Sequence, residues 1–198
     1  MLFYILCFFL TLPFLLVLLL RLRASYASSQ SSIGKELAGK ETIAFFHPYA
    51  HAGGGGERVL WCSIRAVQQR YPTVTCVVYT GDTDVTPSEF LLQAKRQFGV
   101  DINSAGIRFV FLHSRRWVDA SSWKRFTLIG QSLGSLVVGW EALCQLRPDI
   151  YIDSMGYAFT LPLFSLLAGS RVGCYVHYPT ISTDMLEQVE PMKRWRLQ

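Results

Sequence analysis

The chain has 198 residues, of which 51% are hydrophobic and 17% are charged, and its formal net charge is +5. This composition excludes a disordered chain, and the length allows one ordinary domain with a short addition. The Lys and Arg residues are scattered along most of the sequence, which argues against a nucleic-acid-binding surface.

Residues 1–20 contain no charged side chain and are dominated by Leu and Phe. At about 1.5 Å per residue, a helix of this length covers a hydrocarbon core of roughly 30 Å. A cleaved signal peptide is the alternative, because residues 24–27 resemble a cleavage site, but no basic residue precedes the apolar run. Arg21 and Arg23 follow it directly. We therefore expect a single transmembrane anchor over 1–20, with the rest of the chain in the cytosol.

Residues 21–41 connect this anchor to the remainder of the chain. Within them, residues 24–40 are rich in Ser, Gly, Ala and Lys and show no periodicity. Such a composition is typical of a flexible linker, so we expect a short juxtamembrane tether.

From residue 42 onwards, apolar runs alternate with segments of helical periodicity. The runs are apolar throughout, as expected for strands that are covered on both faces of a parallel sheet. The sequence therefore predicts an α/β fold, with a Rossmann-like domain over 42–186 and a tail over 187–198. The expected strands are Thr42–His47, Val74–Thr80, Ile107–Leu112, Asp149–Asp153 and Val172–His177, and the expected helices are Glu57–Tyr71, Pro87–Phe98, Trp123–Leu146, Ala158–Ala168 and one that begins at Ile181.

Four consecutive glycines stand between the first strand and the first helix. Such a run loses much conformational entropy on folding, which is explained if the backbone must approach a ligand closely. The spacing fits neither the dinucleotide fingerprint nor a P-loop. Even so, in α/β folds the N–H groups at the start of a helix in this position often bind phosphates. The alternative interpretation of the four glycines is a tight turn without a ligand. We expect substrate binding by Gly53, Gly54, Gly55, Gly56 and Arg58.

A second motif points to a different enzyme class. Residues 130–134 fit the nucleophile elbow GxSxG around Ser132, and Asp153 and His177 follow in the order of an α/β-hydrolase triad. However, only one strand–helix step would separate Ser132 from the acid, and the glycine turn would have no role. Packing of a helix on small residues also explains the motif, and we favour that interpretation.

The stretch 126–146 that contains this motif is apolar and long enough to cross a membrane. Gln131 and Glu141 make a membrane span costly. We therefore expect either a buried helix or one that lies against the bilayer surface.

Asp153 and His177 close the last two predicted strands, at the edge where parallel sheets hold ligands. For each of them, a structural role and a ligand-binding role are equally consistent with the sequence. His47 and His51 are four residues apart, but Pro48 prevents a helix that would direct both at one ion. We expect no metal site.

Long blocks of this sequence resemble one family of enzymes, the α-1,2-mannosyltransferases that extend dolichol-linked oligosaccharide on the cytosolic face of the endoplasmic reticulum. Together the blocks cover nearly all of residues 42–186. They are Ile43–Tyr49, Gly53–Cys62, Val78–Asp82, Phe126–Ser135, Gly139–Leu143, Pro148–Leu163 and Tyr175–Leu186.

The resemblance implies a GT-B fold of the family 4 type, in which residues 42–186 form the N-terminal, acceptor-side Rossmann domain. It implies mannose transfer from GDP-mannose, with retention, to dolichol-diphosphate-linked Man3GlcNAc2 and Man4GlcNAc2, without a cofactor or a required metal. The glycine turn would meet the donor diphosphate and His177 would face the donor sugar. The implied partners are these two substrates, the endoplasmic reticulum membrane and other early mannosyltransferases of the pathway.

The sequence also departs from the resemblance. The second Rossmann domain, whose acidic motif holds the nucleotide ribose and the sugar, has no counterpart here, and residues 187–198 do not resemble the family. We therefore expect the chain alone to be inactive. A membrane-tethered binding module without catalytic activity is the alternative.

Overall fold

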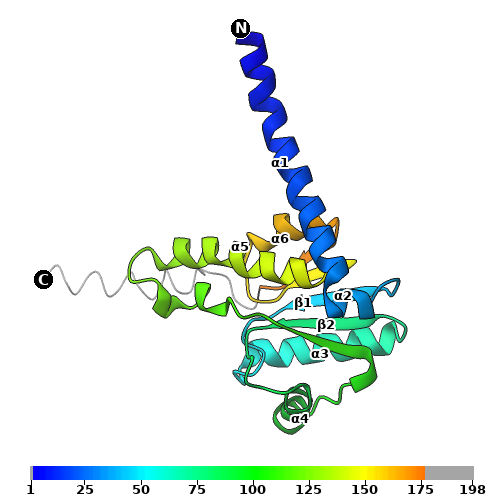
Figure 1. Cartoon of the computed structure of the whole chain (residues 1–198). Coiled ribbons are helices and arrows are strands. Elements are labelled where there is room, and N and C mark those ends of the chain that lie inside the picture. The colour runs from blue at the N-terminus through cyan, green and yellow to red at the C-terminus, as the bar shows by residue number, and fades with distance from the viewer. Residues whose placement is uncertain (1, 177–198) are drawn as a thin grey trace, which may run out of the picture.

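The structure is a computed structural model that describes the backbone of residues 2–176 and the side chains of residues 11–176. A long helix projects from an α/β domain whose central sheet carries helices on both faces (Figure 1). The strands are β1 (Thr42–Phe46), β2 (Thr75–Thr80), β3 (Ile107–Phe111), β4 (Ile150–Asp153) and β5 (Arg171–Cys174). The helices are α1 (Leu2–Gln30), α2 (Ser32–Glu36), α3 (Gly55–Arg70), α4 (Pro87–Phe98), α5 (Thr127–Gln145) and α6 (Thr160–Leu163), with the one-turn segments η1 (Ser104–Gly106), η2 (Arg115–Trp117), η3 (Ala120–Ser122) and η4 (Phe164–Ala168).

The sheet is parallel, with the strand order β3-β2-β1-β4-β5, which confirms the predicted fold class. In this order the chain moves outward from β1 in one direction and then returns to add β4 on the other side. The strand order therefore reverses between β1 and β4, which is where open α/β sheets form their ligand crevice. The pairing sets Phe46 opposite Asp153 at the carboxyl ends of these two strands.

Alternate residues of the central strands enter two separate cores. Phe45 packs with Trp61 of α3 and Phe90 of α4 on one face, whereas Phe46 packs with Leu143 of α5 on the other. All of β1 is therefore buried, as its uninterrupted apolar run predicts. The edge strand β5 differs from the prediction of a buried strand, because Val172 is 40% exposed.

The segment 24–40 is not the flexible tether that we predicted. Helix α1 continues unbroken to Gln30 and packs against α5 and η4, with Ala24 fully buried. Arg147 Nη1 donates to Ser25 Oγ at 2.6 Å. Small side chains allow this close approach, but they carry no apolar periodicity from which a docked helix could be predicted.

Helix α1 also contains the one candidate membrane span in the described part of the chain. The segment Thr11–Gln30 is long and apolar enough to cross a bilayer, and only 11% of its most apolar part is buried against the domain. The same helix is thus a candidate anchor and, through its last turns, a part of the domain's packing.

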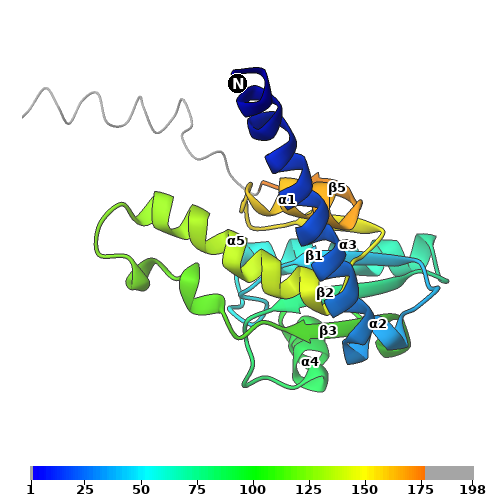
Figure 2. The same ribbon diagram turned by 45° about the horizontal axis from the view of Figure 1, so that its top comes forward.

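Helix α5 is divided between the core and the surface. Its second half is buried on the sheet through residues such as Val138 and Leu143. Its first half extends beyond the sheet, beside the loop that precedes it (Figures 1 and 2). There Leu128, Ile129 and Leu133 are 74%, 60% and 54% exposed.

Candidate functional site

The glycine turn joins β1 to α3 at the carboxyl edge of the sheet, beside the point where the strand order reverses. Helix α3 begins at Gly55, two residues before the predicted start, so two of the glycines belong to its first turn. Gly53 has a φ of +83°, a left-handed conformation that only glycine adopts without strain. Gly54 and Gly55 are exposed to solvent.

The first turn of α3 presents free backbone donors. In the described part of the chain, the N–H groups of Gly55 and Gly56 have no acceptor, as expected where a helix begins. Together with the positive end of the helix dipole, such groups form a site for an anion. The geometry therefore suits a phosphate ligand.

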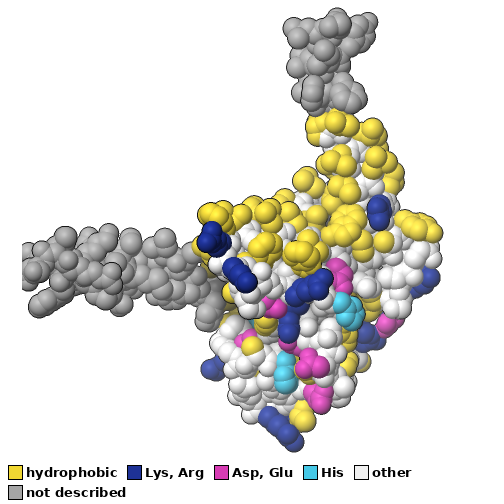
Figure 3. All heavy atoms as spheres, turned by 60° about the vertical axis from the view of Figure 1, so that its left-hand side comes forward, with side chains coloured by type: hydrophobic (Ala, Val, Ile, Leu, Met, Phe, Trp, Pro, Cys, Tyr) yellow, Lys and Arg dark blue, Asp and Glu magenta, His cyan; other side chains and the backbone are white. Residues whose placement is uncertain are grey.

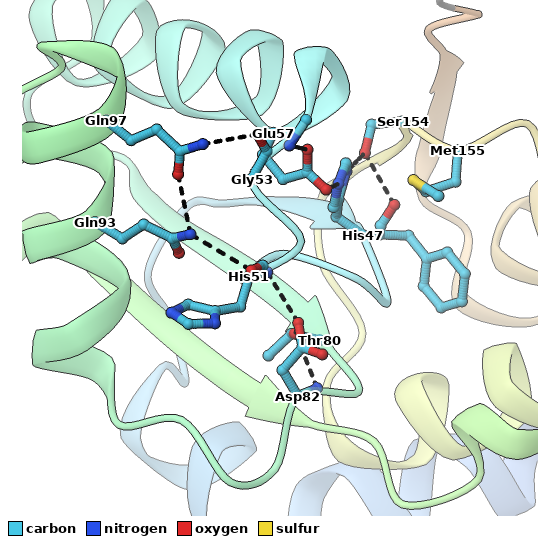
Figure 4. Close-up of polar contacts among 12 residues, drawn as sticks. His47, His51, Gly53, Glu57, Thr80, Asp82, Gln93, Gln97, Ser154 and Met155 are labelled. Atoms are coloured by element: carbon cyan, nitrogen blue, oxygen red, sulfur yellow. Dashed lines mark hydrogen bonds and ion pairs between the residues drawn. The ribbon is translucent and has the colours of Figure 1, made fainter.

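Side chains from two helices hold the turn in place (Figure 4). Glu57 Oε2 accepts a hydrogen bond from the Gly54 N–H at 2.6 Å, and Gln97 Nε2 of α4 donates to the Gly53 carbonyl at 2.7 Å. Two residues before Gly53, the His51 N–H donates to Asp82 Oδ2 at 2.9 Å. The shape of the turn is thus fixed by contacts that leave the N–H groups of Gly55 and Gly56 open.

A cluster of aromatic and charged side chains contacts the beginning of the loop between β1 and α3. Tyr49 Oη donates to Asp119, Arg115 pairs with Asp82, and the Arg115 guanidinium lies 5.2 Å from the centre of the Tyr49 ring. Burial is the main cause that raises the pKa of Tyr49, so this group stays a neutral donor. These contacts tie the loop after β1 to the loops after β2 and β3.

His47 lies fully buried beneath the turn, and the sequence alone had suggested only that it would not bind a metal. Its Nδ1 is 2.8 Å from Ser154 Oγ, and its Nε2 is 3.7 Å from Glu57 Oε1. The facing His47 ring is the largest cause of a lowered pKa at Glu57. Sequence reasoning missed Glu57, although a glutamate three residues after the N-cap position is a known signal for capping the first backbone N–H.

The other predicted site residues are placed differently. Arg58 is exposed in the first turn of α3, next to the open N–H groups. Asp153 is completely buried; its Oδ1 accepts from the Met155 N–H at 3.1 Å, and burial raises its pKa. Its carboxyl group therefore holds the loop after β4 and does not face solvent. His177 lies outside the described residues.

The structure around Ser132 contradicts the α/β-hydrolase alternative. A nucleophile elbow requires a sharp turn from a strand into a helix, whereas α5 runs through all of residues 130–134. The two glycines of the motif are packing positions, since a Cβ on Gly130 would lie 2.2 Å from Trp123 and one on Gly134 would lie 1.9 Å from the Trp117 carbonyl oxygen. The preferred interpretation, a helix packed on small residues, is confirmed.

Comparison with known proteins identifies the family. The profile described as "ALG11 mannosyltransferase N-terminus" matches residues 40–197, which include the whole sheet and the glycine turn. The chain belongs to this family. The match also extends through most of the tail, residues 187–197, that the sequence had led us to set apart.

Curated relatives from distant eukaryotes carry the same name, GDP-Man:Man(3)GlcNAc(2)-PP-Dol alpha-1,2-mannosyltransferase. The Xenopus laevis protein is 59% identical over 157 residues, which are 79% of this chain and 32% of the relative. The human protein is 57% identical over 159 residues, covering 80% of this chain and 32% of the relative, and the Caenorhabditis elegans protein is 49% identical over 150 residues, covering 76% and 32%. The chain thus spans about a third of the length of these family members. No solved structure matches it.

Proposed function

We propose that this chain is the acceptor-side part of a mannosyltransferase that moves α-1,2-linked mannose from GDP-mannose to dolichol-diphosphate-linked Man3GlcNAc2. The observation that carries the proposal is the glycine turn. It offers the two open N–H groups of Gly55 and Gly56 at the reversal point of the sheet, inside a region that is 59% identical to an enzyme of that name.

In this proposal the turn acts on the leaving group. Negative charge grows on the diphosphate as GDP departs, and preorganised N–H donors stabilise that charge more strongly than they stabilise the intact donor. Gly55 and Gly56 supply such donors, and the exposed Arg58 adds a positive charge beside them. His177 is proposed to face the donor sugar, and no metal is required for these steps.

The acceptor has a lipid tail, which gives a function to the exposed first half of α5. Hydrophobic side chains gather on the face of the domain from which α1 projects, with basic side chains at the margin (Figure 3). Leu128, Ile129 and Leu133 belong to the exposed hydrophobic residues of the chain, and Lys124 and Arg125 precede them. We propose that this half-helix lies in the bilayer surface, so that the domain meets a dolichol-linked acceptor in the membrane.

The function can be tested in a chimera that joins this chain to the remaining two thirds of the Xenopus laevis relative. With GDP-mannose and dolichol-linked Man3GlcNAc2, the chimera should form the mannosylated product. Gly55→Glu should lower kcat/KM at least about tenfold relative to Gly55→Gln, because a like charge near the diphosphate costs more than ~1.4 kcal/mol. Glutamate at a helix start is compatible with folding. Equal activity of the two variants would exclude a diphosphate site at this turn.

The proposed use of cytosolic GDP-mannose requires one orientation of the domain. We propose that the enzyme is a single-pass protein of the endoplasmic reticulum membrane, because Arg21 and Arg23 follow the apolar part of α1. An Asn-x-Ser/Thr acceptor site inserted in the exposed turn 38–41 should remain unglycosylated in microsomes. The control carries the same site in a long extension before Leu2, where it should be glycosylated. The reverse pattern would place the domain in the lumen and contradict the proposed donor.

A further inference from the structure

His47 has an incomplete set of polar contacts for a buried side chain. It follows β1, is 0% exposed, and its backbone N–H donates to the Tyr79 carbonyl at 3.0 Å, so its position is fixed. Its Nδ1 meets Ser154 Oγ at 2.8 Å. Its Nε2 has no hydrogen-bond partner within 3.5 Å among the described residues, and faces Glu57 Oε1 at 3.7 Å (Figure 4).

The position of the ring protons follows from the Ser154 hydroxyl. If Ser154 donates to the Phe46 carbonyl, 3.0 Å away, then the Nδ1–H of His47 must donate to Ser154. In that arrangement a bare Nε2 would set its lone pair against the Glu57 carboxylate, which is electrostatically unfavourable, whereas an Nε2–H would attract the carboxylate. If Ser154 instead donates to Nδ1, the proton of the neutral ring lies on Nε2. The electrostatically favourable form of each arrangement therefore directs an N–H at Glu57.

Glu57 is thereby held from two sides. Its Oε1 faces His47, and its Oε2 accepts the Gly54 N–H at 2.6 Å. Without the ring, the carboxylate would be free to rotate toward the other N–H groups at the start of α3. Those groups are the ones that the diphosphate needs, and a misplaced negative charge there would oppose it.

We infer that His47 is a positioning residue for the glycine turn: through its Nε2–H it holds the Glu57 carboxylate at the Gly54 N–H and so keeps the N–H groups of Gly55 and Gly56 open to the donor. Gly56 lies directly on this ring, since a Cβ there would be 3.7 Å from His47 Cε1. The inference rests on the proposed function and adds a residue that does not itself touch the substrate.

Two substitutions of His47 separate positioning from simple filling of the core. In His47→Asn the side-chain amide occupies the position of Nδ1, so the contact with Glu57 is lost. In His47→Gln the longer side chain places its amide at the position of Nε2, so the contact with Glu57 can still form. In the 198-residue chain in detergent, His47→Asn should speed hydrogen exchange of the Gly54 amide about tenfold or more, with His47→Gln within about threefold of the original chain. In the chimera, kcat/KM for GDP-mannose should follow the same order.

Glu57→Gln provides a second test that leaves the ring in place. A carboxylate accepts from both Gly54 and His47, but an amide can accept from only one and must turn its NH2 toward the other donor. We therefore expect faster Gly54 exchange and a lower melting temperature in this isosteric variant. Unchanged or slower exchange would mean that Nε2 is an acceptor, and would overturn the inference.

The outcomes for the two proposals are distinct. Equal effects of His47→Asn and His47→Gln on Gly54 exchange would show that His47 only fills space. If the two differ as expected in exchange, but the unsubstituted chimera transfers no mannose, the positioning contact stands and the proposed function fails.

Discussion

The 198-residue chain, purified on its own, should transfer no mannose. It spans 32% of the Xenopus laevis relative, and within the described residues the contacts proposed for the donor come from a single turn on a single domain. In the GT-B arrangement that the sequence resemblance implies, the acceptor and the donor nucleotide are held on two domains that face each other. Orientation of reactants contributes about 7–11 kcal/mol toward lowering a barrier, so loss of one domain removes essentially all of the measurable rate.

The assay compares the chain and the chimera in the same detergent, with radiolabelled GDP-mannose and dolichol-linked Man3GlcNAc2. The chimera is the positive control, and lipid-extractable label is the readout. Turnover by the chain within about a hundredfold of the chimera would contradict our account, because it would leave less than ~3 kcal/mol for the second domain. Binding of the acceptor without turnover would instead define the chain alone as a membrane-tethered binding module.

Gly134→Ala should destabilise the domain strongly, although alanine is the better helix former. The added Cβ would lie 1.9 Å from the carbonyl oxygen of Trp117, which also accepts a hydrogen bond from Trp123 Nε1 at 3.0 Å. Backbone atoms cannot move aside as a flexible side chain does. We expect a loss of about 2–3 kcal/mol from overpacking, which exceeds the gain of about 1 kcal/mol from helix propensity, so that the net loss is about 1–2 kcal/mol.

Two variants of α5 serve as controls for this prediction. Gly139→Ala receives the same gain in propensity but meets only the side chains of Leu163 and Thr160, at 3.0 and 3.2 Å, so its loss should be smaller. Ser132→Ala should be near neutral in stability, and in the chimera it should keep mannosyl transfer within a few-fold. Thermal unfolding followed by tryptophan fluorescence should show a decrease of about 2–8 °C for Gly134→Ala. A melting temperature equal to that of Ser132→Ala would refute the close packing at Trp117.

Several features of the fold follow from the sequence because they depend on local pattern. Each described strand begins within one residue of its prediction. For β1 the reason is that a strand buried on both faces must be apolar throughout. The glycine turn was predictable because its composition is hard to explain without a close backbone approach. The GxSxG motif was correctly assigned to a packed helix, although its packing partners, Trp117 and Trp123, were not predicted.

The tether and Asp153 show where local pattern is insufficient. Ala24 and Ser28 have little hydrophobicity of their own, and their burial depends on the shape of α5 and η4, which come much later in the chain. Asp153 ends a strand at the predicted edge, but its neighbours in the loop after β4 enclose its carboxyl group. The sequence places a residue along a strand and does not say whether its side chain reaches solvent.

The sequence by itself determined the α/β class, the apolar N-terminal helix, the glycine turn and the family, because each depends on the residues of a continuous stretch of chain. Only the tertiary structure decided how that turn is held. His47 and Ser154 are 107 positions apart and meet because the chain returns to add β4 beside β1. Glu57 joins them because α3 starts directly above the end of β1, so that one buried ring contacts both the turn and the next strand.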